Sequence, residues 1–182
     1  NVIFIQLICT HGRYDKRYPK EFDIFNKAPK NLKFNHKKAI KTINWYDNSM
    51  LYNDFIVREI IELARNENVD SVVYFSDHGD EVYDTIDFAG HNEYLGTQPM
   101  FEIPFIIWLS KDFKNQNLKT SELKKYIKRE FSLEDFIHSY TDLLNISFDK
   151  FDETKSVINP NFVKKNRRVK EGEYYDDIVK KN

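Results

Sequence analysis

A short apolar stretch that ends abruptly in Ser-Asp-His-Gly constrains the fold of this sequence more than any other feature. Residues 71–76 are mostly apolar and include two valines and two aromatic side chains, which predicts a buried β-strand. Asp77 and His78 follow it directly, and ligands of open α/β sheets bind at the carboxyl ends of strands. A carboxylate beside an imidazole suits Zn²⁺ or Mn²⁺. Asp77 and His78 are therefore candidate metal ligands, although Asp-His-Gly alone is a weak signal and a plain strand-ending turn is the alternative.

The placement of the histidines supports a shared site. The chain has five His and five Gly, and three of the histidines adjoin a glycine. These pairs are His11-Gly12, His78-Gly79 and Gly90-His91. Because glycine permits sharp turns, an imidazole beside it can be aimed at a ligand. The alternative is three surface turns in which histidine is incidental.

The order of elements places two of these turns close together. Residues 1–8 are nearly all apolar and predict a second buried strand, which ends at His11. Residues 47–66 predict a helix, with Asp47 or Asn48 as its N-cap. A strand–helix–strand unit pairs its strands in parallel. His11 and Asp77 should then meet at one edge of the sheet.

The remaining segments complete an α/β prediction. Residues 82–100 lack a clear period and predict a long loop over the site, from which His91 could return to the same centre or remain a loop histidine. Further elements are a strand at 101–109, a short helix at 121–130, a helix at 132–145 capped by Ser132, and a polar tail from about 160. His138 lies off the apolar face of its helix and is left out of the site. His36, in a basic stretch, is expected to be exposed and inert.

The length and composition of the chain limit the classes of protein to which it can belong. The 182 residues suffice for one domain over 1–182 with a sizeable core. The net charge of −1 gives no bulk attraction to nucleic acid. The single cysteine, Cys9, excludes a disulfide within the chain. No phosphate-binding Gly-rich loop occurs.

Several segments together resemble the phosphoethanolamine transferases that modify lipopolysaccharide, within the sulfatase and alkaline-phosphatase superfamily. The matches occur in order over nearly the whole chain. They are Thr10-His11-Gly12 with Lys16-Arg17-Tyr18-Pro19, Tyr46-Asp47-Asn48-Ser49, Phe75-Ser76-Asp77-His78-Gly79-Asp80, Gly90-His91, and Ile103-Pro104-Phe105-Ile106-Ile107-Trp108. Two positions depart from the family pattern: Arg13 stands where Pro is usual, and Asp80 where Glu is usual.

The resemblance implies an alkaline-phosphatase/sulfatase-like α/β fold, with a mostly parallel sheet flanked by helices, of which this chain is a partial domain. The resemblance covers only the C-terminal half or so of the family's catalytic domain. It implies membrane helices and a Thr nucleophile upstream, so the isolated chain should be inactive. The parent protein would sit in the bacterial inner membrane with this domain in the periplasm.

The resemblance also implies a mechanism. Phosphoethanolamine would pass from phosphatidylethanolamine to lipid A, a core sugar or another glycan. Asp77 and His78 would hold Zn²⁺, with Mn²⁺ possible. The catalytic residues His11 and His91 would contact the phosphate or a second metal, or protonate the leaving group. Asp80 and Glu81 would orient the ligands or be solvated acids.

Two other functions remain open from sequence. A sulfatase or phosphoglycerol transferase of the same superfamily would use the same metal motif with a different upstream nucleophile. A metal-free fragment or binding module would use the His-Gly turns only to shape loops.

Overall fold

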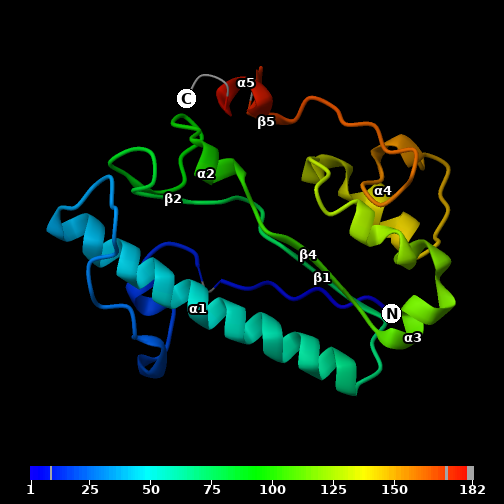
Figure 1. Ribbon diagram of the computed structural model, residues 1–182, viewed down its shortest axis with the longest axis horizontal. Coiled ribbons are helices and arrows are strands. Elements are labelled where there is room, and N and C mark those ends of the chain that lie inside the picture. Colours follow the sequence, from blue (N-terminus) through cyan, green and yellow to red (C-terminus); the bar gives the residue numbers. More distant parts are fainter. Residues whose placement is uncertain (9, 171, 180–182) are drawn as a thin grey trace. The chain divides into compact units, whose positions relative to one another are not determined.

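The computed structural model describes residues 1–8, 10–170 and 172–179 (Figure 1). The chain divides into two compact units, Asn1–Trp108 and Leu109–Asn182. The first unit holds the Asp-His-Gly turn together with His11 and His91, and the second holds His138.

The longest element of the first unit is the 30-residue helix α1, Lys37–Asn66. It begins earlier than the predicted helix at 47–66, and neither Asp47 nor Asn48 is its N-cap. His36 is the cap, and its ring accepts a hydrogen bond of 3.2 Å from the backbone N–H of Ala39. The same ring contacts the Asp87 carboxylate at 2.8 Å. His36 is exposed, as expected, and has a structural role as the cap of α1. The helix stops just before Asn68, whose φ of 56° is left-handed.

One face of α1 buries amides as well as apolar side chains. Asn48 is fully buried. Its Oδ1 accepts hydrogen bonds from the backbone N–H groups of Ile24 (3.0 Å) and Phe25 (2.8 Å), and its Nδ2 donates to Asp23 Oδ1 (3.0 Å). Asn53 donates to the hydroxyl of Tyr74 at 2.8 Å. This face therefore fixes both the loop at 23–25 and the neighbouring strand.

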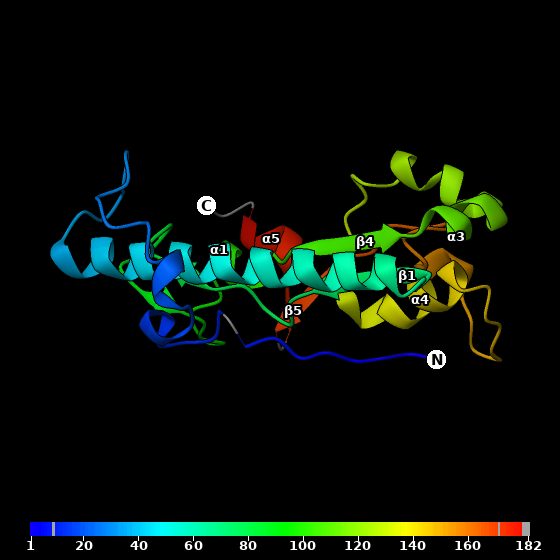
Figure 2. The same cartoon turned by 90° about the horizontal axis from the view of Figure 1, so that it is seen from below.

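That strand is β1, Ser71–Phe75, which pairs with β4, Phe105–Leu109. Figures 1 and 2 show β1 leading away from the end of α1 and β4 running back beside it. The prediction of β1 was correct. The strand predicted at 101–109 starts later, because the turn of helix α2, Gln98–Phe101, comes first and Pro104 stands directly before the strand.

Residues 1–8 do not form the buried strand that the sequence predicted. They form no strand ladder with any other described residue. Ile3 and Phe4 are 81% and 91% exposed. A β-strand requires a neighbour that supplies its hydrogen-bond partners, so the expected parallel pairing of this segment with 71–76 does not occur within the described residues.

The segment predicted as a long loop carries a small hairpin. Strands β2, Glu81–Val82, and β3, Ala89–Gly90, pair antiparallel, with Glu81 opposite Gly90. Two short 3₁₀ turns, η1 (Tyr14–Lys16) and η2 (Lys20–Phe22), pack against α1. Val82 and Tyr83 of the hairpin join a small core with Ala39 and Ile43 of α1.

The second unit is built from short helical pieces. The helix predicted at 132–145 is present as the turn η5, Leu133–Asp135, capped by Ser132, followed by α4, Phe136–Leu143. The prediction of a helix at 121–130 was wrong, since this segment forms 3₁₀ turns. The remaining elements are α3 (Lys111–Gln116), η3 (Leu118–Ser121), η4 (Leu123–Lys125), η6 (Glu153–Lys155), β5 (Arg168–Lys170), β6 (Glu173–Tyr174) and α5 (Tyr175–Val179).

A buried carboxylate organises this unit. Asp142 on α4 is 4% exposed and accepts hydrogen bonds from Lys119 (2.7 Å), Ser156 (2.8 Å) and Asn159 (2.9 Å). Burial alone would raise the pKa of Asp142, but these donors outweigh it and the pKa is lowered. The carboxylate therefore joins three separate segments. His138 also has a structural role in this unit, because its Nδ1 accepts a hydrogen bond of 3.1 Å from the backbone N–H of Asp152.

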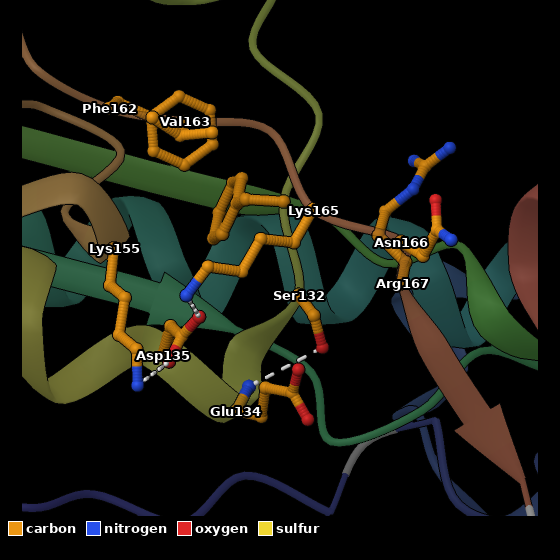
Figure 3. A pocket seen from close by; sticks show the side chains of 10 residues that line it. Ser132, Glu134, Asp135, Lys155, Phe162, Val163, Lys165, Asn166 and Arg167 are labelled. Carbon is orange, nitrogen blue, oxygen red and sulfur yellow. Dashed lines mark hydrogen bonds and ion pairs between the residues drawn. The ribbon is translucent and has the colours of Figure 1, made fainter.

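Figure 3 shows a hollow in the second unit where two lysines flank one carboxylate. Lys155 and Lys165 approach Asp135 at 3.5 and 3.9 Å. The cavity volume is about 20 Å³, which is room for about one water molecule. This hollow is therefore part of the ion-pair packing of the polar segment and too small for an organic ligand.

We expect Asn48→Ala to lower the free energy of unfolding by about 2–3 kcal/mol, since it leaves the two backbone N–H groups of the 23–25 loop without their acceptor. Asn66→Ala, at the exposed end of the same helix, should change it by less than about 0.5 kcal/mol. Urea titrations of both variants measure the difference. Equal losses would contradict the anchoring role of Asn48.

The Asp142 network should make stability pH-dependent in a defined direction. An unfolded aspartate has a pKa of about 3.9, and that of folded Asp142 is lower. Its contribution is therefore complete above about pH 4 and is lost as the pH falls through the folded pKa. We expect urea titrations between pH 6 and 2 to show a smaller acid loss for Asp142→Asn than for the wild-type chain. Parallel pH curves would contradict this.

Candidate functional site

The turn after β1 carries the predicted metal pair. Ser76 Oγ donates a hydrogen bond of 2.7 Å to the carbonyl of His78, and the backbone N–H of His78 donates to Asp77 Oδ1 at 3.1 Å. The ring Nδ1 of His78 lies 3.0 Å from the carbonyl oxygen of Gly79. Because a carbonyl only accepts, Nδ1 carries the proton and Nε2 keeps its lone pair. Nε2 lies 4.0 Å from Asp77 Oδ1, so the two predicted ligands present donors to the same space.

Gly79 is required by a close backbone approach. Its N–H donates to the carbonyl of Met100 at 2.9 Å. A Cβ at this position would lie 2.1 Å from the carbonyl oxygen of Pro99 and 2.7 Å from that of Glu102. Only glycine allows the turn that carries His78 to lie this close to the segment at 99–102.

The three His-Gly histidines come together. The pairing of Glu81 with Gly90 folds the hairpin back, so that His91 returns to the turn after β1. The ring centroids of His78 and His91 are 3.7 Å apart, and those of His11 and His91 are 6.5 Å apart. The side chain of Asp77 is 88% exposed, whereas those of His78 and His91 are 36% and 50% exposed. All four predicted site residues thus lie in one neighbourhood with access to solvent.

Asp80 belongs to the same cluster. Its Oδ1 lies 3.3 Å from Nδ1 of His91 and 3.8 Å from Nδ1 of His78. One donor atom each from His78, Asp80 and His91 lies within 4.8 Å of the others. Sequence left Asp80 open as an orienter or a solvated acid. Its side chain is only 10% exposed, which excludes the solvated alternative.

Tyr14 is a member of the site that sequence reasoning missed. It is buried, and its hydroxyl donates a hydrogen bond of 2.5 Å to Asp80 Oδ2. Burial, followed by the bond to Asp80 and the charge of that carboxylate, raises the pKa of Tyr14 well above its usual range. Its neighbour Tyr46 packs edge-on at 5.1 Å, and burial with the nearby negative charge of Asp80 raises the pKa of Tyr46 to about 12. Both phenols are therefore neutral at physiological pH.

Glu81 is structural. It is completely buried and accepts two hydrogen bonds from Thr85, from the backbone N–H at 2.7 Å and from the hydroxyl at 2.5 Å. Burial alone would raise its pKa, but the Thr85 bonds outweigh it and lower the pKa. The ionised carboxylate closes the hairpin that carries His91.

The donor set fits a divalent transition metal. Tetrahedral Zn²⁺ takes imidazole and carboxylate donors at about 2.0–2.2 Å, which places neighbouring donors about 3.4 Å apart. The observed separations require small side-chain movements, which partly exposed side chains can make. A cation here would face the imidazoles of His78 and His91 and the exposed carboxylate of Asp77, a set suited to polarising a phosphate oxygen.

Comparison with known proteins shows the family of this chain. The chain belongs to the Sulfatase family, whose sequence model matches residues 1–146. It is 36% identical over 175 residues to the phosphoethanolamine transferase EptC of Escherichia coli strain K12, a match that covers 92% of this chain and 30% of that protein. It is 33% identical to the phosphoethanolamine transferase CptA of Salmonella typhimurium strain LT2, over 92% of this chain and 29% of that protein. The chain thus spans less than a third of the length of these relatives.

Solved structures agree with the sequence comparison. The crystal structure of the C-terminal periplasmic domain of EcEptC from Escherichia coli matches with a TM-score of 0.87 and 34% identity, covering 93% of this chain and 50% of that one. The same domain in complex with Zn matches with a TM-score of 0.82 over 87% of this chain and 45% of that one. The family resemblance and the sulfatase-like partial-domain fold are therefore confirmed. Across the part of the chain that the structure describes, no helix has the length and apolar character needed to cross a membrane.

We expect Gly79→Ala to destabilise the protein by about 1–3 kcal/mol, because a methyl group would overlap two carbonyl oxygens. Gly12→Ala is the matched control in the other His-Gly turn, since a Cβ there meets nothing within 4 Å. Thermal unfolding of both variants measures the difference. Equal midpoints would contradict the close approach at Gly79.

Proposed function

We propose that this chain is the C-terminal part of the catalytic domain of a metal-dependent phosphoethanolamine transferase. The single observation that supports this most is the convergence of His11, His78 and His91 beside the Asp-His-Gly turn. The relatives that match over nearly the whole chain are named phosphoethanolamine transferases, which favours this reaction over sulfate-ester hydrolysis.

In this proposal, Asp77 and His78 hold Zn²⁺, with Mn²⁺ as the possible substitute. A cation held there would neutralise phosphate charge and lower the pKa of the nucleophile. Nε2 of His78 is free to bind it, because Nδ1 is engaged by the Gly79 carbonyl. The Zn complex of a similar domain supports the choice of metal.

His11 and His91 act on the phosphate. Phosphatidylethanolamine is the proposed donor, and a nucleophile outside this chain attacks its phosphorus. The bond to the diacylglycerol oxygen breaks, and an imidazole supplies the proton that this oxygen takes up. The acceptor hydroxyl of lipid A, a core sugar or another glycan then attacks the phosphorus of this intermediate and loses its proton to an imidazole, and the bond between phosphorus and the nucleophile breaks, which regenerates the nucleophile. His11 and His91 are the proposed carriers of these protons and binders of the phosphate oxygens.

The proposal includes a location. The complete protein is an inner-membrane enzyme with this domain in the periplasm, where its lipid donor and glycan acceptor meet. The solved relatives include a periplasmic domain and an integral membrane protein, which supports this location. The chain by itself is expected to be inactive, because the nucleophile is supplied by another part of the protein.

We expect Asp77→Ala and His78→Ala to abolish transfer of labelled phosphoethanolamine from phosphatidylethanolamine in the complete protein, and to remove zinc binding measured by calorimetry. The control is His36→Asn, which keeps a capping side chain on α1 and should retain both properties. Wild-type transfer by His78→Ala contradicts the metal assignment. A complete wild-type protein without zinc favours the metal-free alternative. Hydrolysis of a sulfate ester, or transfer of phosphoglycerol, in place of phosphoethanolamine transfer favours another member of the superfamily.

A further inference from the structure

The contacts of Asp80 differ from those expected of a metal ligand. Its Oδ1 lies 3.3 Å from Nδ1 of His91, and its Oδ2 receives the hydroxyl of Tyr14 at 2.5 Å. Both carboxylate oxygens therefore have a hydrogen-bond partner within the protein. The side chain is only 10% exposed, whereas Asp77 is 88% exposed.

This arrangement determines how His91 presents its ring. A carboxylate accepts hydrogen bonds only, so the bond to Asp80 places the proton of His91 on Nδ1. Nε2 then keeps its lone pair for a cation or for a proton in transfer. A carboxylate behind a functional imidazole sets both its tautomer and its orientation.

Tyr14 in turn holds the carboxylate. It lies in η1, close behind His11 in the chain, and is buried against Tyr46 with a ring-centroid distance of 5.1 Å. Rotation of Asp80 away from His91 would break the Tyr14 bond in a buried place, where an unpaired polar group is costly. The hydroxyl therefore links the loop that carries His11 to the loop that carries His91.

We propose that Tyr14 and Asp80 are positioning residues, which hold the imidazole of His91 with its Nδ1 protonated and its Nε2 free. The phenol–carboxylate–imidazole chain joins residues from three turns. Its catalytic consequence rests on the proposed function, whereas its structural consequence does not.

The first test is kinetic and uses the complete protein. Tyr14→Phe removes one hydroxyl and keeps the ring. We expect kcat for phosphoethanolamine transfer to fall about 10-fold, within the range found for residues that support functional histidines, while KM changes less than about twofold. An unchanged kcat would overturn the catalytic consequence.

Tyr18→Phe is the matched control. It removes another phenol-to-carboxylate hydrogen bond from the same loop, the one to Asp23 at 3.1 Å, which has no link to His91. Tyr18→Phe should leave kcat within twofold of wild type. If both variants reduce kcat equally, the effect of Tyr14 is a general loss of loop structure and the proposal fails.

The second test does not depend on the reaction. Magic-angle-spinning NMR of the complete protein, labelled with ¹⁵N-histidine and freed of metal with EDTA, reports which ring nitrogen carries the proton. The His91 signals are those that disappear in His91→Gln. We expect a protonated Nδ1 in wild type and in Tyr18→Phe, and a mixture of tautomers in Tyr14→Phe. An unprotonated Nδ1 in wild type, or identical His91 signals in Tyr14→Phe, would overturn the proposal. If the wild-type protein transfers no phosphoethanolamine, the proposed function fails and these spectra still decide the positioning role.

Discussion

The antiparallel pairing of Glu81 with Gly90 is the contact on which the rest of the site depends. It makes Asp80 and His91, which flank the paired residues, neighbours in space, and it returns His91 to within 3.7 Å of the His78 ring, centroid to centroid. Glu81 is itself completely buried and bonded twice to Thr85. A buried ionised carboxylate is costly unless it is hydrogen-bonded. The same bonds that satisfy this charge therefore close the hairpin.

Two other constraints fix the turn after β1 and the loop at 23–25. The absence of a side chain at Gly79 lets the turn after β1 meet the carbonyl groups at 99–102. The buried amide of Asn48 holds the loop at 23–25 against α1. Each constraint is a backbone group satisfied by a specific partner. The imidazoles of His78 and His91 stay partly exposed beside these paired groups.

The sequence predicted more of the site than of the fold. The Asp-His-Gly turn and the three pairs of adjacent His and Gly identified the residues that converge, because glycine permits the sharp bends and close approaches that bring neighbouring side chains to one place. Apolar runs identified β1 and most of β4. The start of α1 was missed, because a histidine caps the helix in place of the expected Asp or Asn. Tyr14 was missed because its contact with Asp80 joins residues 66 positions apart, and no local pattern encodes such a pair.

The sequence by itself determined the chemistry: which side chains offer nitrogen and oxygen donors, and that they follow strands and turns. The family membership was also readable from ordered motifs. Only the tertiary structure decided that Asp80 faces His91 and Tyr14, while Asp77 faces solvent. It also decided that residues 1–8, although apolar, do not pair within the described chain. The physical reason is the same in both cases. Burial and pairing depend on which partners the rest of the fold brings near, whereas the hydropathy of a segment indicates only its tendency to be buried.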